Sequence, residues 1–163
     1  MEKYTVAVIT VSDKGSAGLR EDASGPLMSA MLTEQGFEVV HTAIIPDDRT
    51  AIAAELIRCA DELRVSLVAT TGGTGFAPRD VTPEATLDVI ERRVPGIPEA
   101  MRAESMKVTN RAMLTRSEAG IRGGTLIINL PGSPKAVREN LAAVIGALDH
   151  GLQMLLAPQR DHE

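Results

Sequence analysis

Aromatic side chains are scarce in this sequence. The 163 residues include no tryptophan, one tyrosine and two phenylalanines, although 44% of the residues are hydrophobic. The core must therefore be aliphatic, and the chain offers few rings on which nucleic-acid bases could stack. The formal net charge of −5 also argues against a nucleic-acid partner, because binding to a phosphate backbone requires a basic face. If the ligand is anionic, its attraction to this chain has to be local.

Thiols are almost absent as well. Cys59 is the single cysteine, which excludes an internal disulfide and a cysteine-based zinc cluster. It lies in a helical pattern, where we expect it to be a small buried hydrophobic residue. His41, His150 and His162 show no spacing typical of metal ligands, so we interpret them as incidental.

Signals for export or membrane insertion are also lacking. Residues 1–4 lead directly into a strand-like run, without the charged segment and the long apolar segment of a secretory signal. The best candidate for a membrane span, residues 141–156, is interrupted by Asp149, His150 and Gln153. The sequence predicts a soluble, cytoplasmic protein that does not bind membranes.

The order of the predicted elements indicates the fold class. The length suits one domain, so we expect residues 1–163 to form a single domain with a core from about residue 4 to 156. Apolar, β-branched runs predict strands at 5–11, 37–45, 66–70 and 125–130. Amphipathic patterns predict helices at 26–35, 49–63, 83–90, 99–106 and 136–156. Alternating strands and helices favour an α/β fold, a three-layer α/β/α sandwich with a mostly parallel sheet.

Two regions carry more local predictions. The buried side of the helix at 49–63 is expected to comprise Ile52, Leu56, Cys59, Ala60 and Leu63. Residues 113–123 are polar and irregular, and they are compatible with either a hairpin or an edge strand.

Residues 65–86 are the most distinctive stretch of the chain. A predicted strand ends there in a glycine-rich loop formed by Thr71, Gly72, Gly73, Thr74 and Gly75. Three glycines within four residues permit positive φ and let backbone amides approach an anion. Thr82 is predicted to cap the next helix, with Pro83 at its first position and Asp80 just before the cap. This order suits a magnesium-bound polyphosphate, although a plain turn with a solvated Asp80 is the alternative.

Other polar loops also follow predicted strands. Their candidate site residues are Ser12 and Asp13, Asp47 and Asp48, and Gly132, Ser133 and Lys135. Each loop has a local alternative, an Asx turn or a helix cap, and Asp22 and Ser24 are candidate caps for the helix at 26–35. Lys135 lies in the first turn of a helix, where a cation opposes the helix dipole and is better placed for a bound anion. Because the carboxyl ends of parallel strands share one edge of a sheet, we expect these loops to gather there.

Taken together, these motifs resemble a known family. The segments VITVSDKGSAG, IPDD, TTGGTG, RDVTPEAT, PGIPEAMR and NLPGSPKA are similar to the molybdopterin adenylyltransferase family of molybdenum cofactor biosynthesis. The resemblance runs from about residue 4 to 156. A sister branch shares the GGTG loop and the PGS turn, whereas RDVTPEA and IPD resemble the adenylating branch.

The resemblance implies a homotrimer that uses ATP and Mg²⁺ to transfer AMP to the terminal phosphate of molybdopterin, with release of pyrophosphate. The product would then pass to a molybdenum-insertion protein. The family's two functional aspartates match Asp47 and Asp80, which would hold the Mg²⁺ ion. The residues expected to contact nucleotide or pterin are Ser12, Asp13, Thr71, Gly72, Gly73, Thr74, Gly75, Arg79, Gly132, Ser133 and Lys135.

Alternatives from other functional classes remain open. A non-adenylating pterin-binding or delivery trimer of the sister branch would keep the same glycine loop and PGS turn. A scaffold module with this fold would not bind pterin tightly. A flavodoxin-like protein would carry a yellow flavin after purification.

Overall fold

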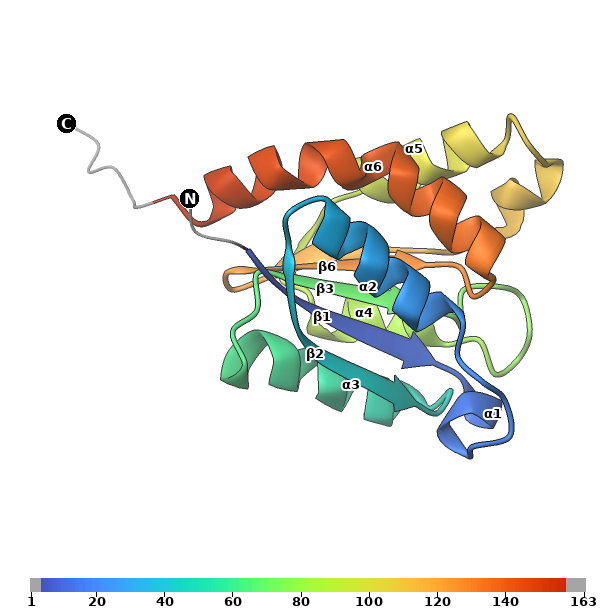
Figure 1. Ribbon diagram of the computed structural model, residues 1–163. Helices are drawn as coiled ribbons and strands as arrows, with labels where there is room; N and C mark the ends of the chain where they lie inside the picture. Colours follow the sequence, from blue (N-terminus) through green and yellow to red (C-terminus); the bar gives the residue numbers. More distant parts are fainter. Residues whose placement is uncertain (1–3, 158–163) are drawn as a thin grey trace.

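The computed structural model describes residues 4–157, so His162 lies outside the described residues. Six strands form one sheet in the order β2-β1-β3-β6-β5-β4 (Figure 1). The strands are β1 (Thr5–Val11), β2 (Glu38–Ile45), β3 (Leu67–Thr71), β4 (Arg92–Arg93), β5 (Ala119–Arg122) and β6 (Thr125–Leu130). The α-helices are α1 (Asp13–Ser16), α2 (Ser24–Glu34), α3 (Arg49–Ile57), α4 (Thr82–Val89), α5 (Gly96–Ser105) and α6 (Pro134–Leu155). A π-helical turn, η1 (Arg58–Glu62), continues α3, and a 3₁₀ helix, η2 (Asn110–Leu114), follows α5.

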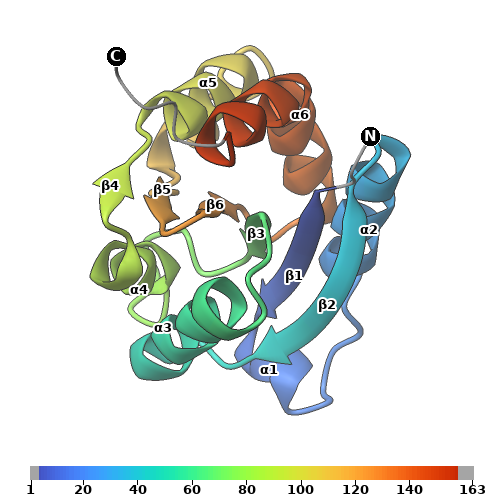
Figure 2. The same cartoon turned by 90° about the vertical axis from the view of Figure 1, so that its left-hand side faces the viewer.

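Helices cover both faces of the sheet, as Figure 2 shows, so the predicted three-layer α/β/α fold is confirmed. On one face, Met28 of α2, Met101 of α5 and Leu141 of α6 join the same apolar cluster. On the other face, Ile52 of α3 and Ala85 of α4 belong to a second cluster. Both clusters are mainly aliphatic, because the chain has too few aromatic residues to fill the core.

The parallel part of the sheet sets the position of the loops. β1 pairs in parallel with β2 and β3, and β3 pairs in parallel with β6. The carboxyl ends of these four strands therefore lie at one edge. From β1 the chain goes to β2 on one side and then to β3 on the other, and such a switch in direction opens a crevice for ligands at that edge.

An antiparallel hairpin forms the far side of the sheet. β5 pairs with β6 across the two-residue turn of Gly123 and Gly124, and β4 pairs antiparallel with β5. Gly123 has φ of +56°, as a tight two-residue hairpin turn requires. A hairpin and an edge strand were both considered for residues 113–123. The hairpin is present, and β5 at residues 119–122 forms its first strand.

Several local predictions about helices were wrong. Thr82 does not cap α4: Val81 holds the cap position, and the Thr82 N–H donates to the Gly73 carbonyl at 3.2 Å. Leu63 is 40% exposed, because the α-helix gives way to the π-helical turn before it and the apolar stripe goes out of phase. α5 begins at Gly96 rather than residue 99, since the first turn of a helix tolerates proline.

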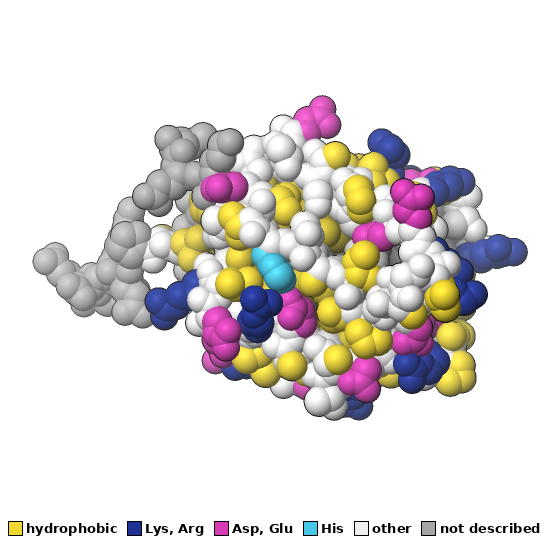
Figure 3. Space-filling model, turned by 60° about the horizontal axis from the view of Figure 1, so that its bottom comes forward, with side chains coloured by type: hydrophobic (Ala, Val, Ile, Leu, Met, Phe, Trp, Pro, Cys, Tyr) yellow, Lys and Arg dark blue, Asp and Glu magenta, His cyan; other side chains and the backbone are white. Residues whose placement is uncertain are grey.

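The surface mixes both signs of charge. On the face drawn in Figure 3, Lys and Arg side chains are interspersed with Asp, Glu and apolar side chains over the described part of the chain. Within residues 4–157, none of the helices combines the length and the apolar character needed to cross a membrane.

Candidate functional site

A cavity of about 500 Å³ opens at the carboxyl edge of the parallel strands. The loops after β1, β2, β3 and β6 all contribute to its wall. The sequence-predicted residues that line it are Ser12, Asp47, Thr71, Gly72, Gly73, Asp80, Gly132 and Ser133. Residues far apart in the chain are thereby brought to one place, as the strand order requires.

Two glycines of the loop after β3 have no room for a side chain. Gly72 has φ of +103°, and a Cβ there would lie 2.3 Å from the carbonyl oxygen of Val11. Gly73 has φ of +68°, and its Cβ would lie 2.4 Å from the hydroxyl of Thr82 and 3.1 Å from Oδ1 of Asp47. The absence of a side chain at these positions lets the loop backbone run directly against the polar wall of the cavity.

Asp47 is held by the loop after β1. Its carboxylate accepts from the Asp13 N–H at 2.9 Å, and its own N–H donates to the Asp13 carboxylate at 3.0 Å. Arg79 closes this arrangement by donating two hydrogen bonds to the Asp13 carboxylate, at 2.8 and 2.9 Å. Asp13 and Arg79 do not line the cavity themselves, so they act as supports for Asp47.

The pKa values of Asp13 and Asp47 are shifted in opposite directions. The Arg79 guanidinium holds the pKa of Asp13 below its ordinary value. Burial raises the pKa of Asp47, the Asp13 and Asp80 carboxylates add to the rise, and the hydrogen bond from the Asp13 backbone opposes it. Asp47 therefore has negative neighbours on two sides, which is an arrangement that a bound cation relieves.

Asp48 has a structural role that differs from that of Asp47. Its side chain accepts from the Ala51 N–H at 2.8 Å and caps α3. The capping alternative is thus right for Asp48, which leaves Asp47 free to face the cavity.

Asp80 projects from a loop that is tied to distant parts of the chain. Its carboxylate lies on the cavity wall and accepts from the Ala77 N–H at 3.0 Å. Arg116 donates to the backbone carbonyls of Gly75 and Asp80, each at 2.8 Å, and pairs with Glu84 of α4. Arg116 was not among the predicted site residues, because nothing in the local sequence shows that it reaches back to this loop.

One buried hydroxyl near the two carboxylates has no partner. Thr82 is fully buried, and its Oγ1 makes no hydrogen bond within the described part of the chain. The closeness of this oxygen to Gly73, already noted, places it beside the cavity. A buried polar atom left unpaired in this way is common where a ligand or water completes the site.

The segment between α1 and α2 forms another part of the cavity wall. From the sequence, Asp22 and Ser24 were considered only as candidate helix caps. Asp22 accepts from the N–H groups of Ser24 and Gly25 at 3.2 and 3.0 Å, and from the hydroxyl of Thr10 at 2.7 Å. The cap position of α2 belongs to Ala23, and Ser24 is the first residue of the helix, so neither predicted cap occupies it. The Ser24 hydroxyl donates to the Gly132 carbonyl at 2.7 Å, joining this wall to the loop after β6. Arg20 lines the cavity as well and provides a cation there.

The other predicted residues have mainly supporting contacts. Thr74 is buried and its carbonyl accepts from the Arg116 N–H at 2.8 Å, and Gly75 packs against the Asp80 carboxylate. Ser133 lines the cavity and also caps α6, by accepting from the Ala136 N–H at 3.2 Å. The Lys135 ammonium is 4.0 Å from Glu139, and its side chain is 78% exposed and not part of the wall.

Comparisons with known proteins identify the family of this chain. Residues 7–150 match a family described as a probable molybdopterin binding domain. The chain is 43% identical over 158 residues to a molybdopterin adenylyltransferase of Helicobacter pylori, covering 96% of this chain and 90% of that protein. It is 41% identical over 147 residues to the molybdopterin adenylyltransferase of Escherichia coli K12, covering 88% of this chain and 75% of that protein.

Solved structures share the fold. The molybdopterin biosynthesis enzyme MoaB from Thermus thermophilus superposes with a TM-score of 0.90 at 44% identity, covering 96% of this chain and 99% of that one. A structure of MogA gives a TM-score of 0.87 at 34% identity, covering 93% and 99% of the two chains. The chain therefore belongs to the family of probable molybdopterin binding domains, together with the molybdopterin adenylyltransferases.

Proposed function

We propose that this chain is a molybdopterin adenylyltransferase, which transfers AMP from ATP to the terminal phosphate of molybdopterin and releases pyrophosphate. The observation that carries the proposal is the convergence of Asp47 and Asp80 beside Gly73 in one cavity. The names of the relatives and the family match support the same activity.

The residues of the cavity fit a magnesium ion. Asp47 and Asp80 supply carboxylate oxygens, which Mg²⁺ prefers, and the unpaired hydroxyl of Thr82 lies close to Asp47. Burial is the main cause of the raised pKa of Asp47, and the nearby Asp13 and Asp80 carboxylates add to the rise. When bound, magnesium supplies charge neutralisation at the α-phosphate and at the departing pyrophosphate.

The rest of the site positions the reacting groups. An oxygen of the terminal phosphate of molybdopterin forms a bond to the α-phosphorus of ATP, and the bond to pyrophosphate breaks. The attacking phosphate is already an anion, so the site needs no strong base. We assign the amide of Gly73 and the N-terminus of α6 at Ser133 to binding of phosphate groups, with Arg20 as a nearby cation. The Gly72 N–H is not available for this role, because it donates to the Leu130 carbonyl at 3.1 Å.

We also propose a homotrimer in the cytoplasm that passes its product to a molybdenum-insertion protein. The family resemblance supports this assembly. Phe76, Met113 and Leu114 are 71%, 58% and 46% exposed, and apolar surface of this kind is often covered by a neighbouring subunit.

The proposed activity is tested by incubating the purified protein with ATP, Mg²⁺ and molybdopterin. Mass spectrometry is expected to detect adenylylated molybdopterin, with one pyrophosphate released for each product formed. Omission of molybdopterin is the control, and it should leave ATP intact. Tight binding of molybdopterin without any product would instead support the non-adenylating sister branch.

The division of labour between Asp47 and Asp48 gives a second prediction. Asp48→Ala removes the cap of α3 and is expected to lower the free energy of unfolding by about 1 kcal/mol, with AMP transfer unchanged at a temperature where both proteins are folded. Asp47→Asn is the matched comparison and should abolish most of the transfer with little loss of stability. Denaturant unfolding and product formation measure the two effects. Equal losses of transfer in both variants would refute the assignment.

A further inference from the structure

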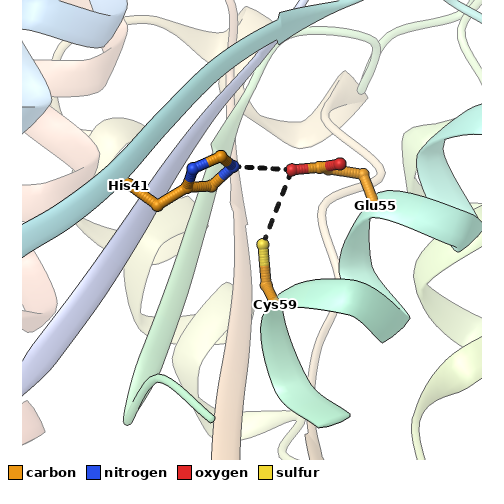
Figure 4. A group of neighbouring side chains, drawn as sticks. All are labelled: His41, Glu55 and Cys59. Atoms are coloured by element: carbon orange, nitrogen blue, oxygen red, sulfur yellow. Dashed lines mark hydrogen bonds and ion pairs between the residues drawn. The ribbon is translucent and has the colours of Figure 1, made fainter. Parts of the chain in front are cut away.

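A second group of side chains lies on the α3 side of the sheet, away from the cavity. His41 projects from β2 toward α3, where Glu55 and Cys59 face it (Figure 4). The His41 Nε2 atom is 2.8 Å from Glu55 Oε1, and the Cys59 Sγ atom is 3.8 Å from the same oxygen. The three potential ligand atoms lie within 4.8 Å of one another. None of the three residues lines the cavity of the proposed active site.

A β-bulge directs His41 to this face. Val6 pairs with Val39, but the next residue, Ala7, pairs with His41, so Val40 is skipped. Val39 packs against the α2 and α6 side, and regular alternation would send His41 to that side too. The extra residue reverses the alternation and turns His41 toward α3.

The Cys59 thiol also lies at an irregularity, in this case of a helix. Cys59 lies in the π-helical turn η1 that follows α3, and it is fully buried. Glu55 lies one turn before it, so the two side chains point to the same side. Bulges and π-turns are both uncommon and are both enriched at functional sites. Here the bulge brings His41 to the same carboxylate oxygen that the Cys59 thiol contacts.

The combination of ligand types selects the kind of metal. An imidazole nitrogen, a carboxylate oxygen and a thiolate sulfur suit Zn²⁺, whereas Mg²⁺ and Ca²⁺ avoid sulfur. Tetrahedral zinc places such nitrogen–oxygen and sulfur–oxygen pairs about 3.3–3.7 Å apart. The distances of 2.8 and 3.8 Å in this group differ from that range by amounts that small side-chain rotations cover.

The surroundings allow an ion to reach the group. The side chains of His41 and Glu55 are 21% and 16% exposed, so two of the three ligand groups can be reached from solvent. Arg58 lies 3.5 Å from Glu55 and would repel a cation, but it is 47% exposed and also lies 3.9 Å from Glu62. Its guanidinium can therefore turn to Glu62 when Glu55 binds a metal.

We propose that His41, Glu55 and Cys59 form a zinc site that fastens the edge strand β2 to α3. Binding replaces the thiol proton of Cys59, which leaves to solvent, and the ion bonds to Cys59 sulfur, His41 Nε2 and a Glu55 oxygen. Three protein ligands leave one position for water. Burial raises the pKa of Cys59 to about 12, with Glu55 adding to the rise, so the thiol is protonated until a metal binds.

Cobalt provides a direct test, because it substitutes for zinc and gives a near-ultraviolet charge-transfer band when a thiolate binds it. Cys59 is the single cysteine of the chain, so such a band in the full-length protein can come only from this residue. We expect one Co²⁺ per chain with this band, displaced by one equivalent of Zn²⁺. Carboxylates of the active-site cavity cannot produce the signal.

Variants separate this site from other zinc binding. Cys59→Ser should remove the band, and His41→Gln and Glu55→Gln should each weaken zinc affinity at least tenfold in competition with a chelating dye. His150→Gln, at an exposed position of α6, is the matched histidine control and should change nothing. Zinc should raise the melting temperature of the unaltered chain but not that of His41→Gln. Absence of the band in the unaltered protein, or equal losses in His41→Gln and His150→Gln, would overturn the proposal.

Discussion

Replacing Asp80 by asparagine is expected to lower AMP transfer by roughly 10²–10³-fold while the chain stays folded. The carboxylate of Asp80 lies on the cavity wall and forms one half of the proposed magnesium site. The substitution removes its negative charge, so the charge that develops on the departing pyrophosphate loses compensation. Asparagine still offers an oxygen to the Ala77 N–H, and Arg116 holds the loop through backbone carbonyls that the substitution does not change.

Asp88→Asn is the matched control for this prediction. Asp88 makes a surface ion pair with Arg49 at 2.7 Å and is not part of the cavity wall. Because this pair is exposed to solvent, its loss is expected to change stability little, with transfer unaffected. Product formation by mass spectrometry and circular dichroism compare the two variants. If Asp80→Asn keeps full activity, or if it does not fold, the role given to Asp80 is incorrect.

Replacing Gly73 by alanine is expected to abolish detectable transfer and to destabilise the fold by roughly 2–4 kcal/mol. The added methyl group would lie 2.4 Å from the Thr82 hydroxyl and 3.1 Å from Asp47 Oδ1. Both neighbours must move, and Asp47 then leaves its position beside the cavity. The positive φ of Gly73 adds backbone strain, because an alanine Cβ disfavours that conformation.

Gly18→Ala separates strain from crowding. Gly18 has φ of +74°, close to that of Gly73, but a Cβ there would meet no atom within 4 Å. Its replacement should therefore show only the conformational part, about 1–2 kcal/mol, with transfer retained. Denaturant unfolding and product assays measure both proteins. Similar activity in the two alanine variants would mean that the crowding at Gly73 does not matter.

The sequence was most informative where the sheet is buried on both faces. β1, β3 and β6 were predicted to within one or two residues, because continuous apolar runs such as TLIINL are typical of a strand covered on both faces. The order of strands and helices then placed the polar loops at one edge, and the family assignment was confirmed by the match over residues 7–150. The roles of individual site residues stay proposals until the variants above are measured.

The missed features depend on contacts between distant segments. Arg116 fastens a loop that lies more than thirty residues earlier, and no local pattern encodes such a reach. Threonine is a common residue type at helix caps, but here Thr82 is the first residue of α4 and its N–H donates to the Gly73 carbonyl. His41 was interpreted as incidental because the bulge that turns it toward Glu55 leaves no regular spacing in the sequence.

The contacts of Arg116 also affect the expected affinity for substrates. One guanidinium joins the backbone at Gly75 and Asp80 to Glu84, and these contacts restrict the loop before any nucleotide binds. Little conformational entropy remains to be lost when a nucleotide arrives, and more of its contact energy is available as affinity. We therefore expect this side of the cavity to change little in conformation when a nucleotide binds.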